Sequence, residues 1–211
     1  MDNTKHLEAL GDIRQMMERS SRFISLSGVS GICAGCFALI GAAAFFVHFQ
    51  LRFDQPQYYQ YARLADGSSN PEFYRFFFTD AALVLLGSLL AGVWFTRRKA
   101  KRNGLALWDS TARRLLINLL IPLVSGGIFC LILLKHDLVA LVAPATLLFY
   151  GLALLNASKY TLNDIRYLGV SEIILGLTGC WFMGYGLLFR TLGFGVLHIV
   201  YGLSMYLKYE R

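Results

Sequence analysis

The sequence predicts an all-α membrane protein, folded as a six-transmembrane-helix bundle. Three observations lead to this class. Apolar residues make up 56% of the 211-residue chain and charged residues only 16%, whereas a soluble domain has about 25% charged residues. Six apolar runs approach the length of about 20 residues that a helix needs to cross a bilayer. These runs do not alternate between apolar and polar residues, which favours helices over a closed barrel.

The six expected spans lie close together along the chain. They cover residues 23–49, 76–95, 115–134, 138–155, 170–189 and 192–207. Only Lys135, His136 and Asp137 separate the third run from the fourth. We therefore expect these two helices to form a tight hairpin, and residues 23–207 to form one transmembrane domain.

The chain begins with a segment that has the pattern of an amphipathic helix. Leu7, Leu10, Ile13 and Met17 recur at helical spacing. We expect segment 1–22 to lie on the inner membrane surface or to bind a partner. Residues 208–211 form a short tail on the same, cytoplasmic, side.

The distribution of basic residues predicts the orientation of the bundle. If the N-terminus is cytoplasmic, 15 of the 20 Lys and Arg residues fall on the cytoplasmic side, as the positive-inside rule requires. The protein is thus expected in the cytoplasmic (inner) cell membrane, with both termini inside. The formal net charge of +7 reflects this topology. A nucleic-acid partner is not expected, because the longest cytoplasmic loop, residues 96–114, is too short for a folded basic domain.

Two stretches of the chain resemble each other weakly. Asp12-Ile13-Arg14 precedes Gly28-Val29-Ser30-Gly31, and Asp164-Ile165-Arg166 precedes Gly176-Leu177-Thr178-Gly179. Each pair leads into an outward-running span. An origin from three helical-hairpin repeats fits this pattern, since membrane folds are often built from repeats.

Glycines at helical spacing predict close helix packing. Gly28, Gly31 and Gly35 share one face of the first span, and Gly195 and Gly202 lie on the side of the last span that carries His198. Small residues at this spacing let two membrane helices approach closely.

The same regions are similar to the serine and histidine motifs of rhomboid intramembrane proteases. The resemblance lies in Gly28-Val29-Ser30-Gly31 and in His198 with Gly202. It implies that Ser30 is a nucleophile and His198 its base. Helix packing accounts for every glycine of the stripe without catalysis, and it is the interpretation that we adopt.

His198 is the leading candidate for a ligand or gating residue. Its glycine neighbours turn it into the bundle, where an imidazole must bond across helices, for example to Asn118 or Tyr150, or line a cavity. Pro122 and Pro144 lie in neighbouring spans, where they would free backbone carbonyls and could shape a polar pocket. Asn118 is the second candidate.

Two carboxylates near the cytoplasmic side complete the candidate set. Asp164 and Glu172 lie eight residues apart, on one helical face. They indicate either a solvated loop with a carboxylate at the interface, or a cytoplasmic binding or gating surface.

Neither a metal nor a cofactor is expected. Cys33 and Cys36 form a CxxC pair near the middle of the bilayer, where a thiolate is costly and cysteine behaves as a small packing residue. At the outer ends, two histidines and two carboxylates could converge on a divalent metal, but they show no ligand spacing within one helix: His48, Asp80, His136 and Asp137.

The composition and motifs together favour a non-enzymatic membrane component that binds a partner, a lipid or a small ligand. The alternatives are a small solute or ion transporter and, third, a membrane-embedded enzyme. The expected partners are the lipid bilayer, anionic lipids at the basic loop that begins Arg97-Arg98-Lys99, and a protein partner or a second copy of the chain.

Overall fold

The computed structural model describes residues 23, 26–51, 57–104 and 108–210. The expected amphipathic segment 1–22 and the last residue of the tail lie outside the described residues. The elements are α2 (Gly28–His48), η1 (Tyr58–Ala62), α3 (Pro71–Arg102), α4 (Ser110–Lys135), η2 (Val139–Leu141), α5 (Val142–Ala157), η3 (Ser158–Tyr160), α6 (Asp164–Trp181), α7 (Gly186–Arg190), η4 (Thr191–Leu197) and α8 (His198–Tyr209). Every named element in these ranges is helical, which confirms the all-α class.

Five helices in the described part of the chain are long and apolar enough to cross a membrane. They are α2, α3, α4, the stretch Val139–Tyr160 around α5, and the stretch Gly186–Tyr209 that ends in α8. The remaining long helix, α6, has 18 residues and carries Asp164, Arg166 and Glu172. The protein is therefore a helical membrane protein, and α6 is a long helix that is not among these five.

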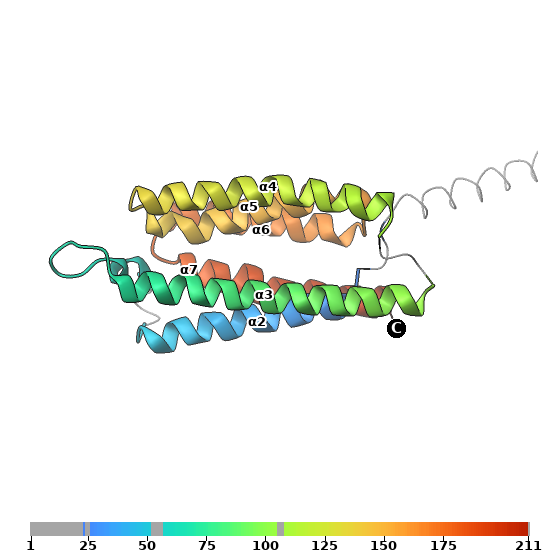
Figure 1. Cartoon of the computed structure of the whole chain (residues 1–211), viewed down its shortest axis with the longest axis horizontal. Helices are drawn as coiled ribbons and strands as arrows, with labels where there is room; N and C mark the ends of the chain where they lie inside the picture. Colours follow the sequence, from blue (N-terminus) through green and yellow to red (C-terminus); the bar gives the residue numbers. More distant parts are fainter. Residues whose placement is uncertain (1–22, 24–25, 52–56, 105–107, 211) are drawn as a thin grey trace, which may run out of the picture.

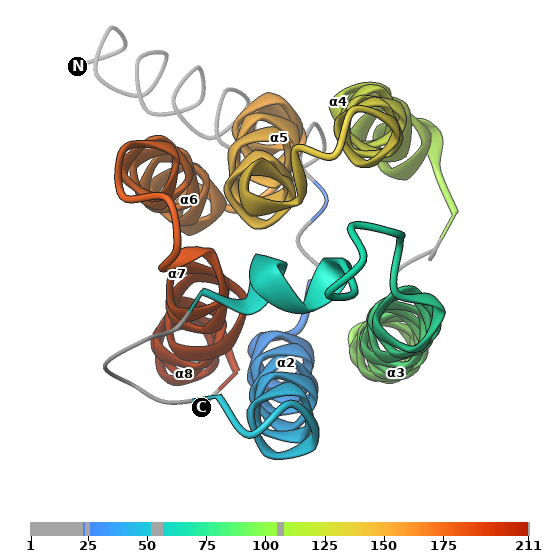
Figure 2. The same cartoon turned by 90° about the vertical axis from the view of Figure 1, so that its left-hand side faces the viewer.

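The helices form two layers (Figures 1 and 2). One layer contains α4, α5 and α6, with α5 in the middle. The other contains α3, α2 and the helix from α7 to α8, with α2 in the middle. The layers meet where α5 and α6 pack on α7 and η4. Seen from the end, η1 crosses over the middle of the bundle (Figure 2).

Local signals fix several helix boundaries. Asn70 caps α3 by accepting from the amide of Glu72 at 3.0 Å, and Pro71 takes the first helical position, where no amide proton is needed. Asp109 caps α4 through the amide of Ala112 at 2.6 Å. The expected hairpin after α4 turns at Asp137, which has a φ of 60°.

The last break between helices lies earlier than the sequence pattern suggested. We expected a helix over 170–189 and another over 192–207, with Arg190 in the turn. Instead α6 ends at Trp181, and the turn contains Gly184 with a φ of 111°, a conformation that favours glycine. The apolar residues around this turn hid the break, and Arg190 continues the helix.

The last helix contains a π-helical segment. α7, η4 and α8 follow one another without a gap, and η4 is a π-helix. A π turn contains one more residue than an α-helical turn, so its backbone hydrogen bonds have shifted partners. Such turns often lie at functional sites. His198 is the first residue after this segment.

Glycines allow α2 and the last helix to touch through their backbones. A methyl group on Gly35 would lie 2.6 Å from the carbonyl oxygen of Gly195. On Gly202 it would lie 2.6 Å from the amide nitrogen of Ile32, and on Gly28 it would overlap Gly202 and Tyr206. Gly31 is less crowded, at 3.2 Å from the Cα of Gly202. Side chains larger than hydrogen would therefore separate these helices.

Aromatic side chains close the end of the bundle where α3 begins. Phe45, Tyr58 and Phe73 are buried together with Val139 and Leu187. The Tyr58 hydroxyl donates to the Val139 carbonyl at 3.1 Å, and burial raises the pKa of this hydroxyl, so it stays a donor. The described part of the loop between α2 and α3 thus packs onto the helix ends.

Candidate functional site

The most unusual group in the described structure is the carboxylate of Glu172. Its side chain is 0% exposed in the middle of α6. Neither of its oxygens has a hydrogen-bond partner. Buried polar groups are nearly always hydrogen-bonded, and an ionisable group inside a membrane protein marks a functional site by default.

His198 lies next to this carboxylate and is itself buried, at 7% exposure. Its Nε2 is 2.7 Å from the Tyr150 hydroxyl on α5. Its Nδ1 is 3.0 Å from the Gly193 carbonyl and 3.5 Å from Oε1 of Glu172. The site therefore joins α5, α6 and the last helix at a level where each helix is near its midpoint.

The π-helical segment shapes this site. The carbonyl that His198 contacts belongs to Gly193, five residues earlier, inside η4. A methyl group on Gly193 would overlap Oε2 of Glu172 and Cδ2 of Leu147. Glycine at this position therefore makes room for the carboxylate against the backbone of the last helix.

The hydrogen-bond partners satisfy both nitrogens of the imidazole. A carbonyl only accepts, so Nδ1 carries a proton toward Gly193. The Tyr150 hydroxyl can donate to Nε2 of a neutral ring or accept from Nε2 of a protonated ring. Neither carboxylate oxygen of Glu172 takes part in these hydrogen bonds. The carboxylate is left with apolar neighbours and a donor that is already engaged.

The other candidate residues lie apart from this pair. Asp164 is at the start of α6, where it accepts from Lys208 at 3.1 Å and from the Tyr209 hydroxyl at 2.7 Å. Asp164 and Glu172 share a helix, as predicted from their spacing, but they belong to two separate groups of contacts.

Asn118 takes part in the hydrogen bonds between α4 and α5. Its carbonyl, which Pro122 releases from the helical ladder, accepts from the side-chain amide of Asn156 at 3.0 Å. Its own side chain donates to Arg114 at 2.8 Å. The freed carbonyl is thus used in helix packing. Pro144 lies in the first turn of α5, where an amide has no partner within the helix, so the carbonyl that this proline was expected to free is not released from α5.

The serine and histidine of the rhomboid-like motifs are not bonded to each other. The Ser30 hydroxyl donates to the Ser27 carbonyl at 2.5 Å, whereas the ring of His198 contacts Tyr150 and Gly193. Cys33 and Cys36 are free thiols. These contacts suit packing on α2.

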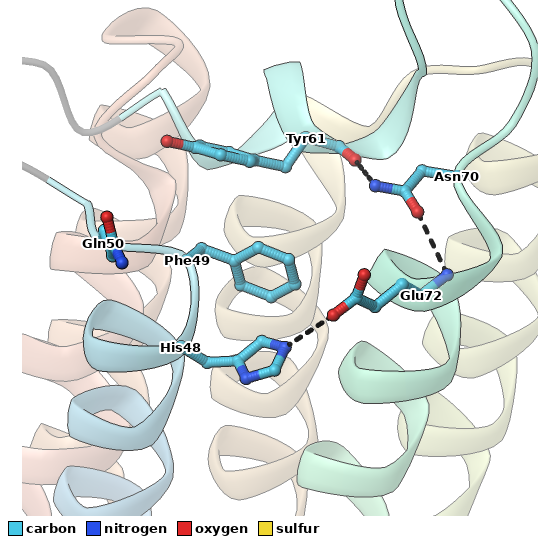
Figure 3. A pocket seen from close by; sticks show the side chains of 6 residues that line it. All are labelled: His48, Phe49, Gln50, Tyr61, Asn70 and Glu72. Atoms are coloured by element: carbon cyan, nitrogen blue, oxygen red, sulfur yellow. Dashed lines mark hydrogen bonds and ion pairs between the residues drawn. The ribbon is translucent and has the colours of Figure 1, made fainter.

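The polar residues at the end of the bundle where α3 begins belong to separate ion pairs. His48 faces Glu72 at 3.3 Å, beside Asn70 and Tyr61 in a shallow pocket (Figure 3). Asp80 is 3.9 Å from Arg190, and Asp137 pairs with Arg63 at 2.7 Å. Among the described residues, no three histidine, cysteine or acidic side chains gather as metal ligands.

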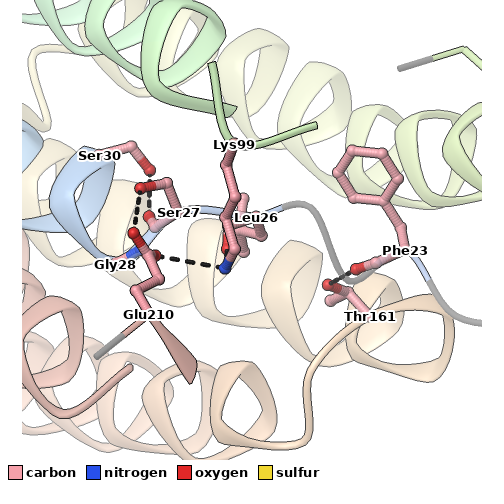
Figure 4. Close-up of polar contacts among 8 residues, drawn as sticks. All are labelled: Phe23, Leu26, Ser27, Gly28, Ser30, Lys99, Thr161 and Glu210. Carbon is pink, nitrogen blue, oxygen red and sulfur yellow. Dashed lines mark hydrogen bonds and ion pairs between the residues drawn. The ribbon is translucent and has the colours of Figure 1, made fainter. Parts of the chain in front are cut away.

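A half-buried carboxylate with several donors, which the sequence pattern did not indicate, lies at the opposite end of the bundle, where α2 begins. Oε1 of Glu210 accepts from the Gly28 amide at 2.6 Å and from Lys99 at 3.3 Å, and Oε2 accepts from the Ser27 hydroxyl at 3.2 Å (Figure 4). Lys99 also donates to the Leu26 carbonyl at 2.7 Å. A carboxylate at a helix N-terminus is a favourable arrangement, but only the fold brings Glu210 there.

Comparisons with protein-family models, with characterised proteins and with solved structures find no match to this chain. The functional argument therefore depends on the geometry of the site.

Proposed function

We propose that this protein is a non-enzymatic membrane component that acts by binding, and that a small cation is the ligand held at Glu172. The sequence left a partner, a lipid and a small ligand as alternatives. The observation that favours a small cation is the fully buried carboxylate whose two oxygens have no donor. An uncompensated charge in such a place is costly, so a positive ligand would stabilise it strongly.

The surroundings of the carboxylate limit the size of this ligand. Gly193 leaves no room for even a methyl group between Oε2 and the last helix. Leu147 is also fully buried beside it. A lipid headgroup or a metabolite does not fit between these groups, whereas a single ion requires little space.

The test is the thermal stability of the purified protein in detergent. Sodium, potassium or choline chloride is varied at a constant ionic strength of about 0.15 M, and the pH is varied between about 5 and 8. We expect at least one cation, the proton included, to raise the melting temperature of the wild type. Glu172→Gln should lose this response.

Asp164→Asn is the matched control, because it removes a carboxylate from the same helix near the bundle surface. It should keep the response of the wild type. Identical responses of the wild type and Glu172→Gln to every cation would contradict a binding site at Glu172.

A second candidate function is transport of an ion or a small solute. Basic groups of the last helix face carboxylates at three levels: Arg190 faces Asp80 at 3.9 Å, His198 faces Glu172 at 3.5 Å, and Lys208 faces Asp164 at 3.1 Å. Chains of ionisable groups across a bundle are typical of ion pathways. Reconstituted vesicles with an enclosed pH-sensitive dye would test this function, and Glu172→Gln should abolish any proton flux.

The proposal includes six spans in the cytoplasmic membrane, with both termini inside. The 18 residues of α6 would cover about 27 Å, close to the hydrocarbon thickness. The end of α3, the start of α4 and the end of α8 lie at the same end of the bundle (Figure 1), which suits an even number of spans. Basic residues at this end would contact anionic lipids. A protein partner or a second copy of the chain would bind the lipid-facing helices.

Cysteine labelling of intact cells tests this orientation. Thiols introduced at Asp66 or Ser68 should react with an impermeant reagent, and thiols at Asn103 or Ser158 should not. Labelling of the second pair alone would reverse the orientation.

A further inference from the structure

We infer that the cation bound at Glu172 is a proton, carried on the carboxyl group itself beside a neutral His198. This inference rests on the proposed function, since it names the ligand of that site. It assigns Glu172 as a proton-binding residue of the membrane interior, and His198 and Tyr150 as the groups that position it.

The first argument is the charge balance of the pair. The Nδ1 proton of the imidazole is directed at the Gly193 carbonyl at 3.0 Å, and a neutral ring is satisfied when Tyr150 donates to the other nitrogen. Beside such a neutral ring, an ionised Glu172 would be one isolated negative charge at 0% exposure. A protonated ring beside an ionised Glu172 would bury two charges, and neither carboxylate oxygen would have a hydrogen bond to offset the desolvation. One proton on either carboxyl oxygen, beside the neutral ring, removes the isolated charge and leaves all other hydrogen bonds unchanged.

The second argument is that the site cannot surround a metal ion. Sodium, calcium and similar hard cations need several oxygen ligands at once. The other oxygen atoms that His198 contacts at this site are the Gly193 carbonyl and the Tyr150 hydroxyl. Together with Glu172 they are too few to surround a hard cation, whereas a proton needs a single carboxyl oxygen.

The third argument is the composition of the elements packed against the carboxylate. The titratable groups that face it are Tyr150 from α5 and His198 from the last helix. Lys208 is engaged with Asp164 at the far end of α6. Unless His198 is protonated, no cationic side chain in the described part of the chain lies beside Glu172. A proton is therefore the nearest positive charge that can neutralise this carboxylate.

Loss of the proton has a structural consequence. The resulting carboxylate would lie against the backbone of the π-helical segment at Gly193, where there is no room for a side chain larger than hydrogen. Water or a donor would have to enter between α6 and η4 to solvate it. Proton release is thus expected to loosen the contact between α6 and the last helix, the place where the two layers of the bundle meet.

Infrared spectroscopy tests the protonation state directly. In the purified wild type in detergent at about pH 7, we expect a carbonyl stretching band of a protonated carboxylic acid. This band should vanish in Glu172→Gln and persist in Asp164→Asn. Absence of the band from the wild type, or its persistence in Glu172→Gln, would overturn the inference.

The pH dependence of thermal stability provides the second measurement. A glutamate in the unfolded chain loses its proton near pH 4.3, so above this pH the folded protein binds one more proton than the unfolded one. Its stability must then fall as the pH rises. We expect the melting temperature of the wild type to decrease from about pH 5 to 8 by more than that of Glu172→Gln.

The two measurements separate this inference from the proposed function. If sodium or potassium changes the melting temperature at fixed pH and Glu172→Gln removes this change, the cation site is retained and the inference that its ligand is a proton is overturned. If Glu172→Gln alters neither the salt response nor the pH response of the melting temperature, both the proposed function and this inference are overturned. His198→Asn is the positioning variant, and it should shift the acid band of Glu172 in frequency without removing it.

Discussion

Glu210 and Glu172 are two carboxylates with opposite surroundings. Glu210, which is 14% exposed at the end of the bundle where α2 begins, accepts from the Gly28 amide, the Ser27 hydroxyl and the Lys99 ammonium group. Glu172, in the middle of the bundle, is 0% exposed and accepts from no donor. The less buried carboxylate is thus the one that has hydrogen-bond donors. The difference lies in whether the fold supplies donors, and the predictions below test this difference.

The largest effect is expected when the cation is removed from the satisfied carboxylate. Lys99→Met leaves Glu210 without its charge partner and removes the donor to the Leu26 carbonyl. Because the two side chains are 11% and 14% exposed, we expect a loss near the lower end of the about 3 to 5 kcal/mol that breaking a fully buried pair costs. The melting temperature in detergent should fall accordingly. Lys101→Met, at an exposed position of the same helix end, is the control and should change it little. Equal effects of the two variants would refute the structural role of the Glu210 cluster.

Close packing around the same cluster gives the next effect. A leucine at Gly28 would overlap backbone atoms of Gly202 and Tyr206, and overpacking of this kind costs up to about 3 kcal/mol. Gly31→Leu should lower thermal stability by a smaller amount. Gly92→Leu is the control, since no atom lies within 4 Å of the corresponding methyl position. Thermal unfolding of the three variants checks this order.

A small effect on stability is expected at the unsatisfied carboxylate. Glu172→Gln preserves the shape of the side chain and removes the ionisable group, so at about pH 7 stability should stay within about 1 kcal/mol of the wild type. Unfolding in denaturant would measure it. A loss as large as that of Lys99→Met would show that Glu172 is a structural carboxylate like Glu210.

The smallest effect is expected at a fully exposed carboxylate. The hydroxyl and amide of Ser68 donate to Asp66 at 2.6 and 2.9 Å and lower its pKa. Ser68→Ala removes the hydroxyl, so the pKa of Asp66 should rise while the melting temperature stays unchanged. An NMR titration of the Asp66 carboxyl carbon measures the first quantity. A fall in melting temperature would mean that exposed pairs of this loop contribute to stability.

Much of the candidate site was visible in the sequence, but its connections were not. The glycines beside His198 predicted that this side chain points into the bundle, and it is buried there. Tyr150 was one of two expected partners. Glu172 was interpreted with Asp164 as part of a cytoplasmic face, because residues eight apart share a side of a helix. Asp164 and Glu172 lie at different positions along α6, one at its start and one in its middle, because the helix begins at Asp164. This difference separates the two carboxylates.

Other features had no local signal. The π-helical segment needs an extra residue in one turn, which no motif of the last span announced. The end of α6 at Trp181 was hidden because apolar residues continue through the turn. Glu210 caps α2 from about 180 residues away along the chain, so spacing could not have linked them.

The sequence by itself determined the helical class, most of the membrane-crossing helices and the glycine faces. These properties follow from composition and from the 3.6-residue period, which are local to each helix. Only the tertiary structure decided which carboxylate has hydrogen-bond donors. Hydrogen-bond donors come from other helices, so the state of Glu172 depends on how α5, α6 and the last helix pack around Gly193.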